Sequence, residues 1–519
     1  MRFLNQPIEF LPLAGQAMPT WTAQVGVREL HSFCTTAQVA GRRLVALWGS
    51  DEQDRASPHG YSLHVALDLA EGLACLTLPL STAHPEFLDL SLIFPVANRM
   101  QRAVRDMIGA QPMAEDQRPW LRHDNWPVDY YPLRSATPDA RFGTQNEAYA
   151  FVRVEGDGVH EIPVGPIHAG IIEPGHFRFS VVGETVLRLE ERLGWKHKGI
   201  ERRFVGLSLD EGAKLAGRVS GDSTVAYAWA YSQAVEALVG MIPPPRALWL
   251  RALLLERERI ANHLGDLGYL GNDAALAFGL MQFMRLKEDW IRLHGQLFGH
   301  RLLMDCIIPG GVSVDLDSQG SQALLAQCDA IEREVRTLKR IYDDHAGLQD
   351  RFLTTGCVMP QLAQRLGVIG LAGRASAQAW DLRCTHPCTP YETLAPRIAT
   401  HSNGDVAARV LVRFAEIFES LRLIRMLVND MPPGEIQGEN SDQIRAQSGR
   451  YGYGWIEGWR GDVLVALEVD AQGAIRRCHC HDPSWQNWPA LEHAVIGNIV
   501  PDFPLINKSF NLSYAGQDL

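Results

Sequence analysis

Alternation of apolar and polar residues marks strands in the first quarter of the chain. The stretches 43–48, 62–67 and 73–80 alternate in this way and predict three strands. Over 95–108 the period changes to that of a helix. Four apolar residues fall on one stripe of this helix: Val96, Met100, Val104 and Ile108. The stretch therefore predicts a mixed α/β unit.

A second pattern begins near residue 150. Alternating stretches at 177–182 and 185–189 flank Gly183-Glu184 and predict a β-hairpin. Beyond about residue 205 the pattern is mainly helical, and Ser208-Leu-Asp-Glu211 has the form of a capping box. Further helices are expected at 222–239, 243–267, 280–298, 321–344, 359–366 and 406–428, and strand-like alternation returns at 451–475.

These patterns predict an α+β fold. We expect a mixed α/β domain over residues 1–135, a linker over 136–150, and a large, mainly helical domain with a small hairpin sheet over 151–519. The linker is polar and contains Pro138 and Gly143.

Composition narrows the class of protein. The 519 residues are 46% hydrophobic and 21% charged, as in ordinary globular chains, and the formal net charge is −11. An acidic balance argues against a general nucleic-acid binder. No apolar run approaches the ~18 residues that cross a bilayer, and the first residues lack a signal-peptide core. We therefore expect a cytoplasmic protein that can still dock on a membrane complex.

The cysteines do not form a disulfide framework or a convincing metal site. There are nine, with no Cys-x-x-Cys spacing. In Cys478-His-Cys-His481, neighbours on a strand point to opposite faces, so four side chains do not converge on one ion. Cys384 and Cys388 lack a second pair of ligands. We predict no metal at either place, and no nucleotide-binding glycine loop is present.

Two polar segments have alternative interpretations. The Gly/Pro-rich stretch 165–176 holds His168, Glu173 and His176, and it is either a functional loop or a solvated surface loop. The charged run 195–203 is either a solvated face or a surface for a partner carboxylate or a redox centre.

Several motifs, taken in order, resemble one family. They are Gly165-Pro-Ile-His168, Glu173-Pro-Gly-His-Phe-Arg178, Lys196-His-Lys-Gly-Ile-Glu201, Glu256-Arg-Glu-Arg-Ile-Ala-Asn-His-Leu264, Gly271-Asn-Asp273, Asp381-Leu-Arg383 with Tyr391, and Pro432-Pro-Gly-Glu435. Together they resemble the large subunit of membrane-bound, group 4 nickel–iron hydrogenases of the hydrogenase-4 and formate hydrogenlyase type. That family is homologous to the 49-kDa subunit of respiratory complex I.

The first domain resembles the 30-kDa subunit of complex I, which is fused to the large subunit in the hydrogenase family. Its motifs are Phe94-Pro-Val-Ala-Asn-Arg-Met100, Arg105-Asp-Met-Ile-Gly109 and His123-Asp-Asn-Trp-Pro127. The similarity extends over nearly the whole chain.

The chain departs from the family where the metal is bound. The family holds nickel and iron with four cysteines in two Cys-x-x-Cys pairs, and the matching positions here are Ser220, Ser223, Ser513 and Gly516. A nickel site of this type needs soft thiolate ligands, which serine and glycine do not supply. We therefore expect no nickel–iron centre.

The quinone residues of complex I are also replaced. The position of its headgroup histidine falls at Ile172 and that of its tyrosine at Gly221. Tyr227 or Tyr514 is a candidate replacement for the tyrosine. The candidate cavity for a quinone or another small molecule is formed by Ser220, Asp222, Ser223, Ser513 and Gly516.

The resemblance implies further site residues and partners. Glu173 resembles the acid that hydrogenases place beside the metal as a proton carrier. With His168, Arg374 and Asp381 it forms a candidate proton relay around the same pocket; the alternative is that Glu173 only caps its loop through a backbone N–H. The implied partners are a small iron–sulfur subunit and antiporter-like membrane subunits, at the inner face of the cell membrane.

Two functions follow from this resemblance. In the first, the chain passes electrons from a neighbouring iron–sulfur cluster to quinone or another acceptor, coupled to ion translocation. In the second, it is a non-redox scaffold or coupling subunit of an ion-translocating complex.

Overall fold

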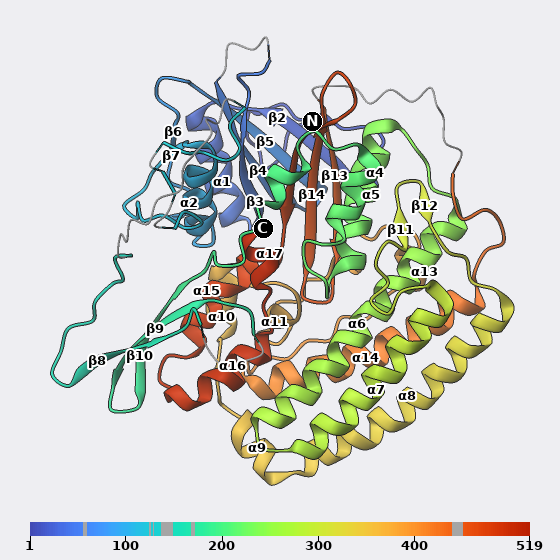
Figure 1. The fold of residues 1–519 in the computed structure, drawn as a ribbon. Helices are drawn as coiled ribbons and strands as arrows, with labels where there is room; N and C mark the ends of the chain where they lie inside the picture. The colour runs from blue at the N-terminus through green and yellow to red at the C-terminus, as the bar shows by residue number, and fades with distance from the viewer. Residues whose placement is uncertain (56–59, 124–125, 128, 136–148, 168–171, 439–449) are drawn as a thin grey trace.

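The computed structural model describes residues 1–519 apart from 56–59, 124–125, 128, 136–148, 168–171 and 439–449 (Figure 1). The predicted linker, 136–150, lies almost wholly outside the described residues. So does His168.

A five-stranded sheet forms the N-terminal part, in the order β1-β2-β5-β4-β3. Its strands are β1 (Leu11–Pro12), β2 (Thr20–Gln24), β3 (Arg43–Asp51), β4 (Tyr61–Leu69) and β5 (Gly72–Leu80). Helices α1 (Val27–Val39) and α2 (Ala97–Ile108) pack against it, beside the short pair β6 (Glu86–Leu88) and β7 (Gln111–Met113). The three predicted strands and the helix stripe are confirmed, and all four stripe residues are buried.

A second sheet packs on the first. It consists of β13 (Tyr451–Glu457), β14 (Asp462–Val469) and β15 (Ile475–His481). One apolar cluster joins Val45 and Trp48 of the first sheet to Trp455 and Leu464 of the second. Helix α5 (Thr224–Val239) packs against β13 and β14. Residues 1–135 and the C-terminal strands therefore share a core.

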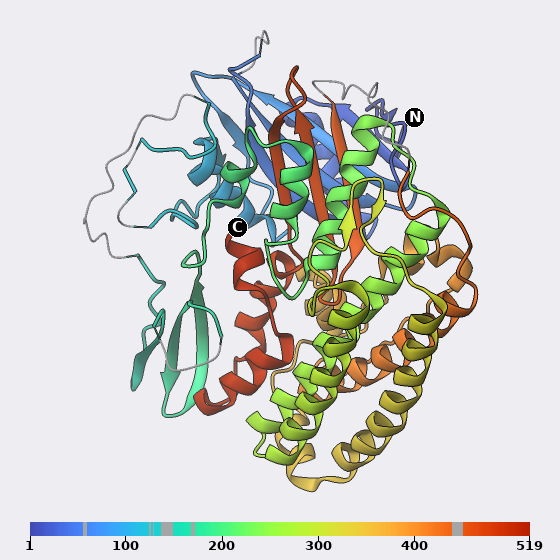
Figure 2. The same ribbon diagram turned by 45° about the vertical axis from the view of Figure 1, so that its right-hand side comes forward.

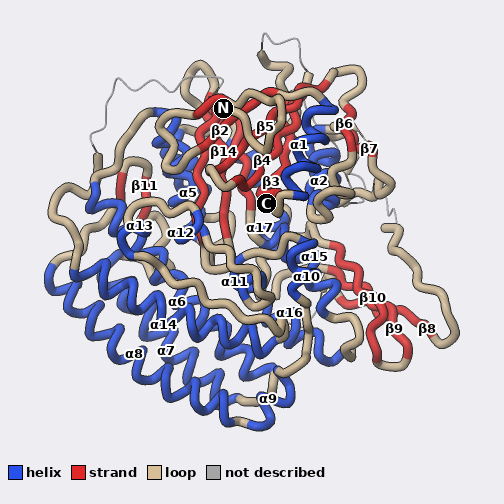
Figure 3. Tube along the Cα trace, turned by 180° about the vertical axis from the view of Figure 1, so that it is seen from behind, coloured by secondary structure: helices blue, strands red, loops and turns tan. Residues whose placement is uncertain are grey.

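Long helices build the largest part of the molecule. They are α6 (Pro245–Asp273), α7 (Ala277–Phe298), α8 (Ser318–Asp344) and α14 (Val406–Asn429), which run side by side below the sheets (Figures 1 and 3). Proline at the start of α6 suits a first helical turn, whose N–H groups have no partner inside the helix. The predicted α+β fold is confirmed.

A third sheet stands away from the bundle (Figure 2). It is made of β8 (Val159–Val164), β9 (His176–Val182) and β10 (Thr185–Arg192). The predicted hairpin is confirmed, with Gly183 in the left-handed conformation at φ 59°.

Shorter elements complete the described chain. They are α3 (Ile200–Phe204), α4 (Leu209–Ala216), β11 (Ile307–Ile308), β12 (Gly311–Val312), α9 (Ala346–Phe352), α10 (Pro360–Leu366), α11 (Gly370–Arg374), α12 (Leu382–Thr385), α13 (Tyr391–Leu394), α15 (Ser484–Ala494), η1 (Val500–Asp502), α16 (Phe503–Phe510) and α17 (Tyr514–Asp518). The Ser208–Glu211 capping box is present at α4. None of the described helices combines the length and apolar character needed to cross a bilayer.

Candidate functional site

The four positions that match the family's cysteines meet in the folded chain. Ser220 and Ser223 precede α5, and Ser513 and Gly516 lie at the start of α17. The hydroxyl oxygens of Ser220 and Ser513 are 3.0 Å apart, although 293 positions separate them in the sequence. We call Ser220, Asp222, Ser223, Ser513, Gly516 and Arg460 the serine site.

A helix cap holds one half of this site, and side-chain hydrogen bonds to the backbone hold the other. Ser513 is the N-cap of α17, and its Oγ accepts a hydrogen bond from Gly516 N at 2.8 Å. On the other side, Asn262 and Trp459 both donate to the backbone oxygen of Asp222 at 2.8 Å. The segment before α5 is therefore fixed by side chains from α6 and from the β13–β14 loop.

Arg460 is the cation of the serine site, and the sequence reasoning missed it. It donates from Nη1 and Nη2 to the two carboxylate oxygens of Asp222 at 2.9 and 2.6 Å, and from Nη1 to Ser223 Oγ at 3.3 Å. Burial acts to raise the pKa of Asp222, but Arg460 and the Ser220 hydroxyl lower it to about 2. The available signal was an arginine in a tight glycine-flanked turn, Gly458-Trp-Arg-Gly461.

Asp482 is the second residue that the sequence reasoning missed. A Cβ atom on Gly516 would lie 2.5 Å from Cγ of Asp482, so this carboxylate occupies the space that a longer side chain at 516 would need. Its Oδ2 accepts a hydrogen bond from the hydroxyl of Tyr227 at 2.7 Å. Burial raises the pKa of the Asp482 carboxyl. Its position directly after the Cys-His-Cys-His segment was the available signal.

Arg374 and Asp381 form an ion-pair cluster of their own, and their predicted place around the serine site stays a prediction. Both are fully buried and are 3.4 Å apart in an ion-pair cluster with Glu416 and Glu457. No hydrogen bond or ion pair between described residues joins either of them to the serine site. The carboxylates of Glu416 and Glu457 compensate Arg374, and Arg460, from the β13–β14 loop, is the guanidinium that pairs with Asp222.

Glu173 lies at the edge of the serine site. Its Oε2 accepts a hydrogen bond from Ala515 N at 3.1 Å, and its Oε1 is 3.2 Å from Nζ of Lys196. The side chain is 41% exposed, so the expected partly dry surroundings are not found. The backbone bond agrees with the alternative that Glu173 caps, although it caps the C-terminal segment rather than its own loop.

The positions that match the quinone residues are open or apolar. Gly221 is exposed, and a Cβ atom there would meet nothing within 4 Å. Ile172 packs against the apolar core. Tyr227 and Tyr514, the candidate replacements, are 0% and 4% exposed. Tyr227 is the one whose hydroxyl contacts the site, through Asp482.

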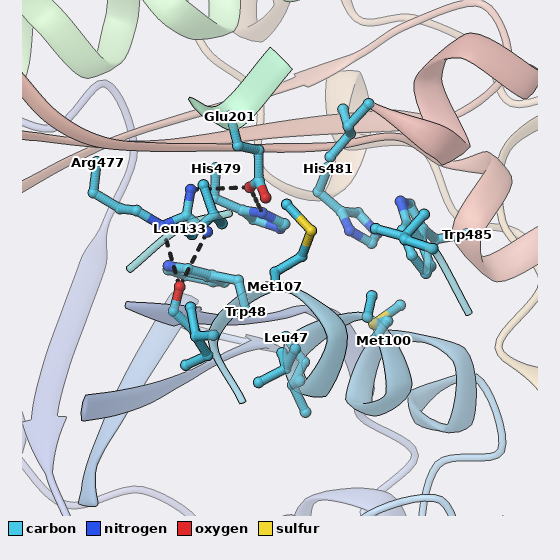
Figure 4. A pocket seen from close by; sticks show the side chains of 16 residues that line it. Leu47, Trp48, Met100, Met107, Leu133, Glu201, Arg477, His479, His481 and Trp485 are labelled. Atoms are coloured by element: carbon cyan, nitrogen blue, oxygen red, sulfur yellow. Dashed lines mark hydrogen bonds and ion pairs between the residues drawn. The ribbon is translucent and has the colours of Figure 1, made fainter. Parts of the chain in front are cut away.

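The Cys-His-Cys-His segment forms β15, and its side chains alternate as predicted. The sulfur atoms of Cys478 and Cys480 are 3.9 Å apart on one face, while His479 and His481 point from β15 toward α2 (Figure 4). No group of three or more histidine, cysteine or carboxylate side chains suited to a metal is found in the described parts of the chain.

The two histidines line a cavity of about 30 Å³ between the first sheet and β15 (Figure 4). Glu201 enters it from the charged run 195–203; its Oε1 is 2.7 Å from Nδ1 of His479 and accepts from Arg477 at 3.0 Å. Burial acts to raise the pKa of Glu201, but Arg477 and His479 lower it to about 2. The run is therefore not simply a solvated face.

The donor atoms of the serine site do not match a nickel–iron centre. It offers three hydroxyls and, at Gly516, no side chain, whereas such a centre requires soft thiolates. Ser220 and Ser513 hydrogen bond to each other at 3.0 Å, so their hydroxyls satisfy one another within the chain. The site is instead suited to hydrogen bonding and to holding a fixed charge pair.

Comparison with family models divides the chain in two. Residues 21–142 match the 30-kDa subunit of respiratory-chain NADH dehydrogenase, and residues 273–518 match its 49-kDa subunit. Among solved structures, a chain of the archaeal membrane-bound sulfane sulfur reductase is similar, with a TM-score of 0.66 and 24% identity over 70% of this chain and 99% of that one. That similarity concerns the fold.

Curated relatives that match most of the chain are also found. Formate hydrogenlyase subunit 5 of Escherichia coli is 31% identical, and the match covers 92% of this chain and 85% of that subunit. Hydrogenase-4 component G of the same organism is 32% identical, and the match covers 92% of this chain and 83% of that component. A subunit of the NADH-quinone oxidoreductase of Dehalococcoides mccartyi is 30% identical over 67% and 95%. The chain therefore belongs to the family of fused 30-kDa and 49-kDa complex I-like subunits that includes the large subunits of group 4 hydrogenases.

Proposed function

We propose that this chain is the large subunit of a complex I-like oxidoreductase at the inner face of the cell membrane, and that it works without a nickel–iron centre. It receives electrons from an iron–sulfur cluster of a small partner subunit and passes them to quinone or another small organic acceptor. Antiporter-like membrane subunits couple this transfer to ion translocation. The proposal is supported by relatives that are named as subunits of formate hydrogenlyase, hydrogenase-4 and NADH-quinone oxidoreductase.

The serine site carries the proposal. Ser220, Ser223 and Ser513 are 4–5% exposed, and Arg460 and Asp222 form a fixed charge pair beside them. Hydroxyl and guanidinium groups donate hydrogen bonds to carbonyl oxygens, and oriented donors stabilise the negative charge that a reduced carbonyl gains. A quinone-like acceptor suits these residues better than a metal does.

The second candidate function is a non-redox scaffold or coupling subunit. One observation favours it: the serine hydroxyls already hydrogen bond within the chain, and Tyr227 and Tyr514 are both buried. An acceptor would have to displace some of these bonds. Under this candidate, the complex assembles and translocates ions, but no electrons reach the serine site.

One preparation tests both candidates. The complex is isolated from its native host through a tag on this chain, and its nickel and iron are counted. Its clusters are then reduced chemically and mixed with a water-soluble quinone, and their reoxidation is followed by rapid-freeze electron paramagnetic resonance. If the chain relays electrons to quinone, the complex should contain no nickel. Reoxidation of the clusters by quinone should then slow at least tenfold in Arg460→Gln and be unchanged in Arg333→Gln on α8. One nickel per chain contradicts both candidates. Clusters that quinone does not reoxidise, or no clusters at all, support the scaffold.

A further inference from the structure

A second group of charges is buried beside the loop that carries Arg460. Four carboxylates and three guanidiniums meet between α6, α11, α12, α14 and β13, all at most 4% exposed. The carboxylates are Glu256, Asp381, Glu416 and Glu457, and the guanidiniums are Arg259, Arg374 and Arg383. We call these seven residues the buried ion cluster.

Arg374 is at the centre of this cluster. It donates from Nε to Glu416 and from Nη1 to Glu457, both at 2.8 Å, and it lies 3.4 Å from Asp381. Arg383 bridges Asp381 at 2.7 Å and Glu256 at 3.0 Å. Each of these two guanidiniums is therefore shared between carboxylates.

The charges of the cluster do not balance. Four carboxylates against three guanidiniums leave one negative charge in excess, and an uncompensated charge in a buried site is costly. Among the described residues, the other titratable base in contact is His263, whose Nε2 is 2.8 Å from Glu416 Oε2. Its Nδ1 has no hydrogen-bond partner in the described parts of the chain, so protonating it would bury an unpaired N–H. The balancing proton thus belongs on a carboxylate.

Glu457 is the least compensated of the four. The carboxylate of Glu256 accepts hydrogen bonds from Arg383, Tyr391 and Ser420, and it lies 3.4 Å from Arg259. The carboxylate of Glu457 accepts one hydrogen bond from the guanidinium of Arg374, which is shared with Glu416, and one from the backbone N–H of Leu382 at 3.1 Å.

The other groups near Glu457 do not supply a further positive charge to its carboxylate. Asp381 and Asp462 are acidic, Cys384 is a neutral thiol, and Arg259 donates to the backbone oxygen of Glu457. Asp462 is itself paired with Arg43 at 2.9 Å.

We propose that the buried ion cluster is a proton-binding site that holds one exchangeable proton on Glu457. Burial and then the charge of Asp381 raise the pKa of Glu457 to about 7, whereas the pKa of Glu416 is held well below its usual range despite burial, mainly by Arg374. Burial lowers the pKa of His263.

The site adjoins the serine site through the backbone. Glu457 ends β13, three residues before Arg460, and Arg259 holds the carbonyl oxygens of Glu457 and Gly458 at 2.8 and 3.0 Å. Uptake or release of the proton therefore changes the charge next to the loop that carries Arg460. Proton binding by Glu457 does not depend on the proposed function. Only the use of this proton to supply an electron acceptor rests on that function.

Infrared spectroscopy of the purified full chain tests the proposal. The carbonyl stretch of protonated carboxylic acids is recorded on both sides of pH about 7, in the wild type and in Glu457→Gln. The other carboxyl groups of raised pKa are common to both chains, so subtraction isolates Glu457. They are Glu191, Glu258, Asp273, Asp482 and Asp518. We expect one carboxylic acid to be lost per chain at low pH, and Glu288→Gln to leave the spectrum unchanged.

Three results would overturn the proposal. The first is a carboxylic acid band that is unchanged in Glu457→Gln, and the second is a band that disappears in His263→Gln instead. The third is a Glu457→Gln chain that does not fold, because glutamine has the size and charge of the protonated acid and should replace it without loss. Failure of quinone to reoxidise the clusters would contradict the proposed relay and leave this result untouched.

Discussion

Gly516 and Asp482 occupy adjoining space: a Cβ atom on Gly516 would lie 2.5 Å from Cγ of Asp482. Gly516 is the position of the fourth family cysteine, and Asp482 is anchored by the hydroxyl of Tyr227 at 2.7 Å. The loss of the ligand side chain and the placement of this carboxylate are therefore coupled sterically. Restoring a cysteine at 516 alone would not restore a ligand set.

Gly516→Ala tests this coupling. Because the new methyl group overlaps a buried carboxylate, we expect the free energy of unfolding to fall by about 1–3 kcal/mol. Gly516→Ala combined with Asp482→Ala is expected to cost less than the sum of the single changes, as measured by urea unfolding in a double-mutant cycle. Gly221→Ala, in open space in the same region, is the control and should be near neutral. Additive effects would show that the two residues do not compete for space.

Arg460→Gln removes the cation that neutralises Asp222. The carboxylate then keeps the hydroxyls of Ser220 and Ser223 and the weaker influence of the Lys287 charge. Its side chain is 39% exposed, so solvent moderates the loss. We expect about 1–2 kcal/mol of destabilisation, partly relieved in the double variant with Asp222→Asn. Chemical denaturation at neutral pH measures both. Equal stability of the single variant and the wild type would mean that the pair contributes nothing to the fold.

Glu457 should make stability depend on pH with a defined sign. Its pKa in the folded chain is about 7, above the unfolded value of about 4.3, so the folded chain binds more protons in between. The wild type therefore loses about 3–4 kcal/mol relative to Glu457→Gln as pH rises from about 4 through the folded pKa to about 8, and little beyond that. Unfolding curves at several pH values check this. A constant difference across the range would contradict it.

Glu416→Gln is the contrasting change in the same cluster. Glu416 is ionised and receives Arg374 and His263 at 2.8 Å each, so the neutral amide leaves a buried guanidinium undercompensated. We expect Glu416→Gln to lose about 3–5 kcal/mol at pH 7, whereas Glu457→Gln should gain stability relative to the wild type at that pH. Thermal unfolding of the two variants side by side measures the difference, and similar losses would refute the assignment of the proton.

Arg202 offers a clean test of assembly. It is exposed on α3, whereas Lys198 donates to Val219 O at 2.8 Å and supports the chain locally. If the face around α3 binds the small subunit, Arg202→Glu should release that subunit during tag purification. Arg333→Glu, on α8, is the control. Unchanged co-purification would place the interface elsewhere.

Local patterns in the sequence were sufficient for the elements. The period-two stretches became β3, β4 and β5, the hairpin formed around Gly183, and the Ser208 capping box opens α4. These features depend on residues two to four positions apart, so the chain records them directly. The motifs in order were also enough to identify the family, and Ser220 and Ser513, 293 positions apart in the sequence, lie in hydrogen-bonding contact.

What the sequence could not decide was which distant charges meet. Arg374 was expected beside the serine site, but Arg460 is there, and Arg374 pairs with Glu416 and Glu457. A guanidinium pairs with whichever carboxylate the packed helices and strands bring within about 3 Å, and that depends on contacts spanning up to hundreds of residues. Which side chains are buried is also decided by the tertiary structure. The sequence does not show that Glu173 is 41% exposed, nor that Glu457 lies in a buried cluster. The sequence by itself determined the family, the elements and the loss of the thiolates, whereas tertiary packing decided the ion pairs, because desolvation and charge compensation are properties of the assembled core.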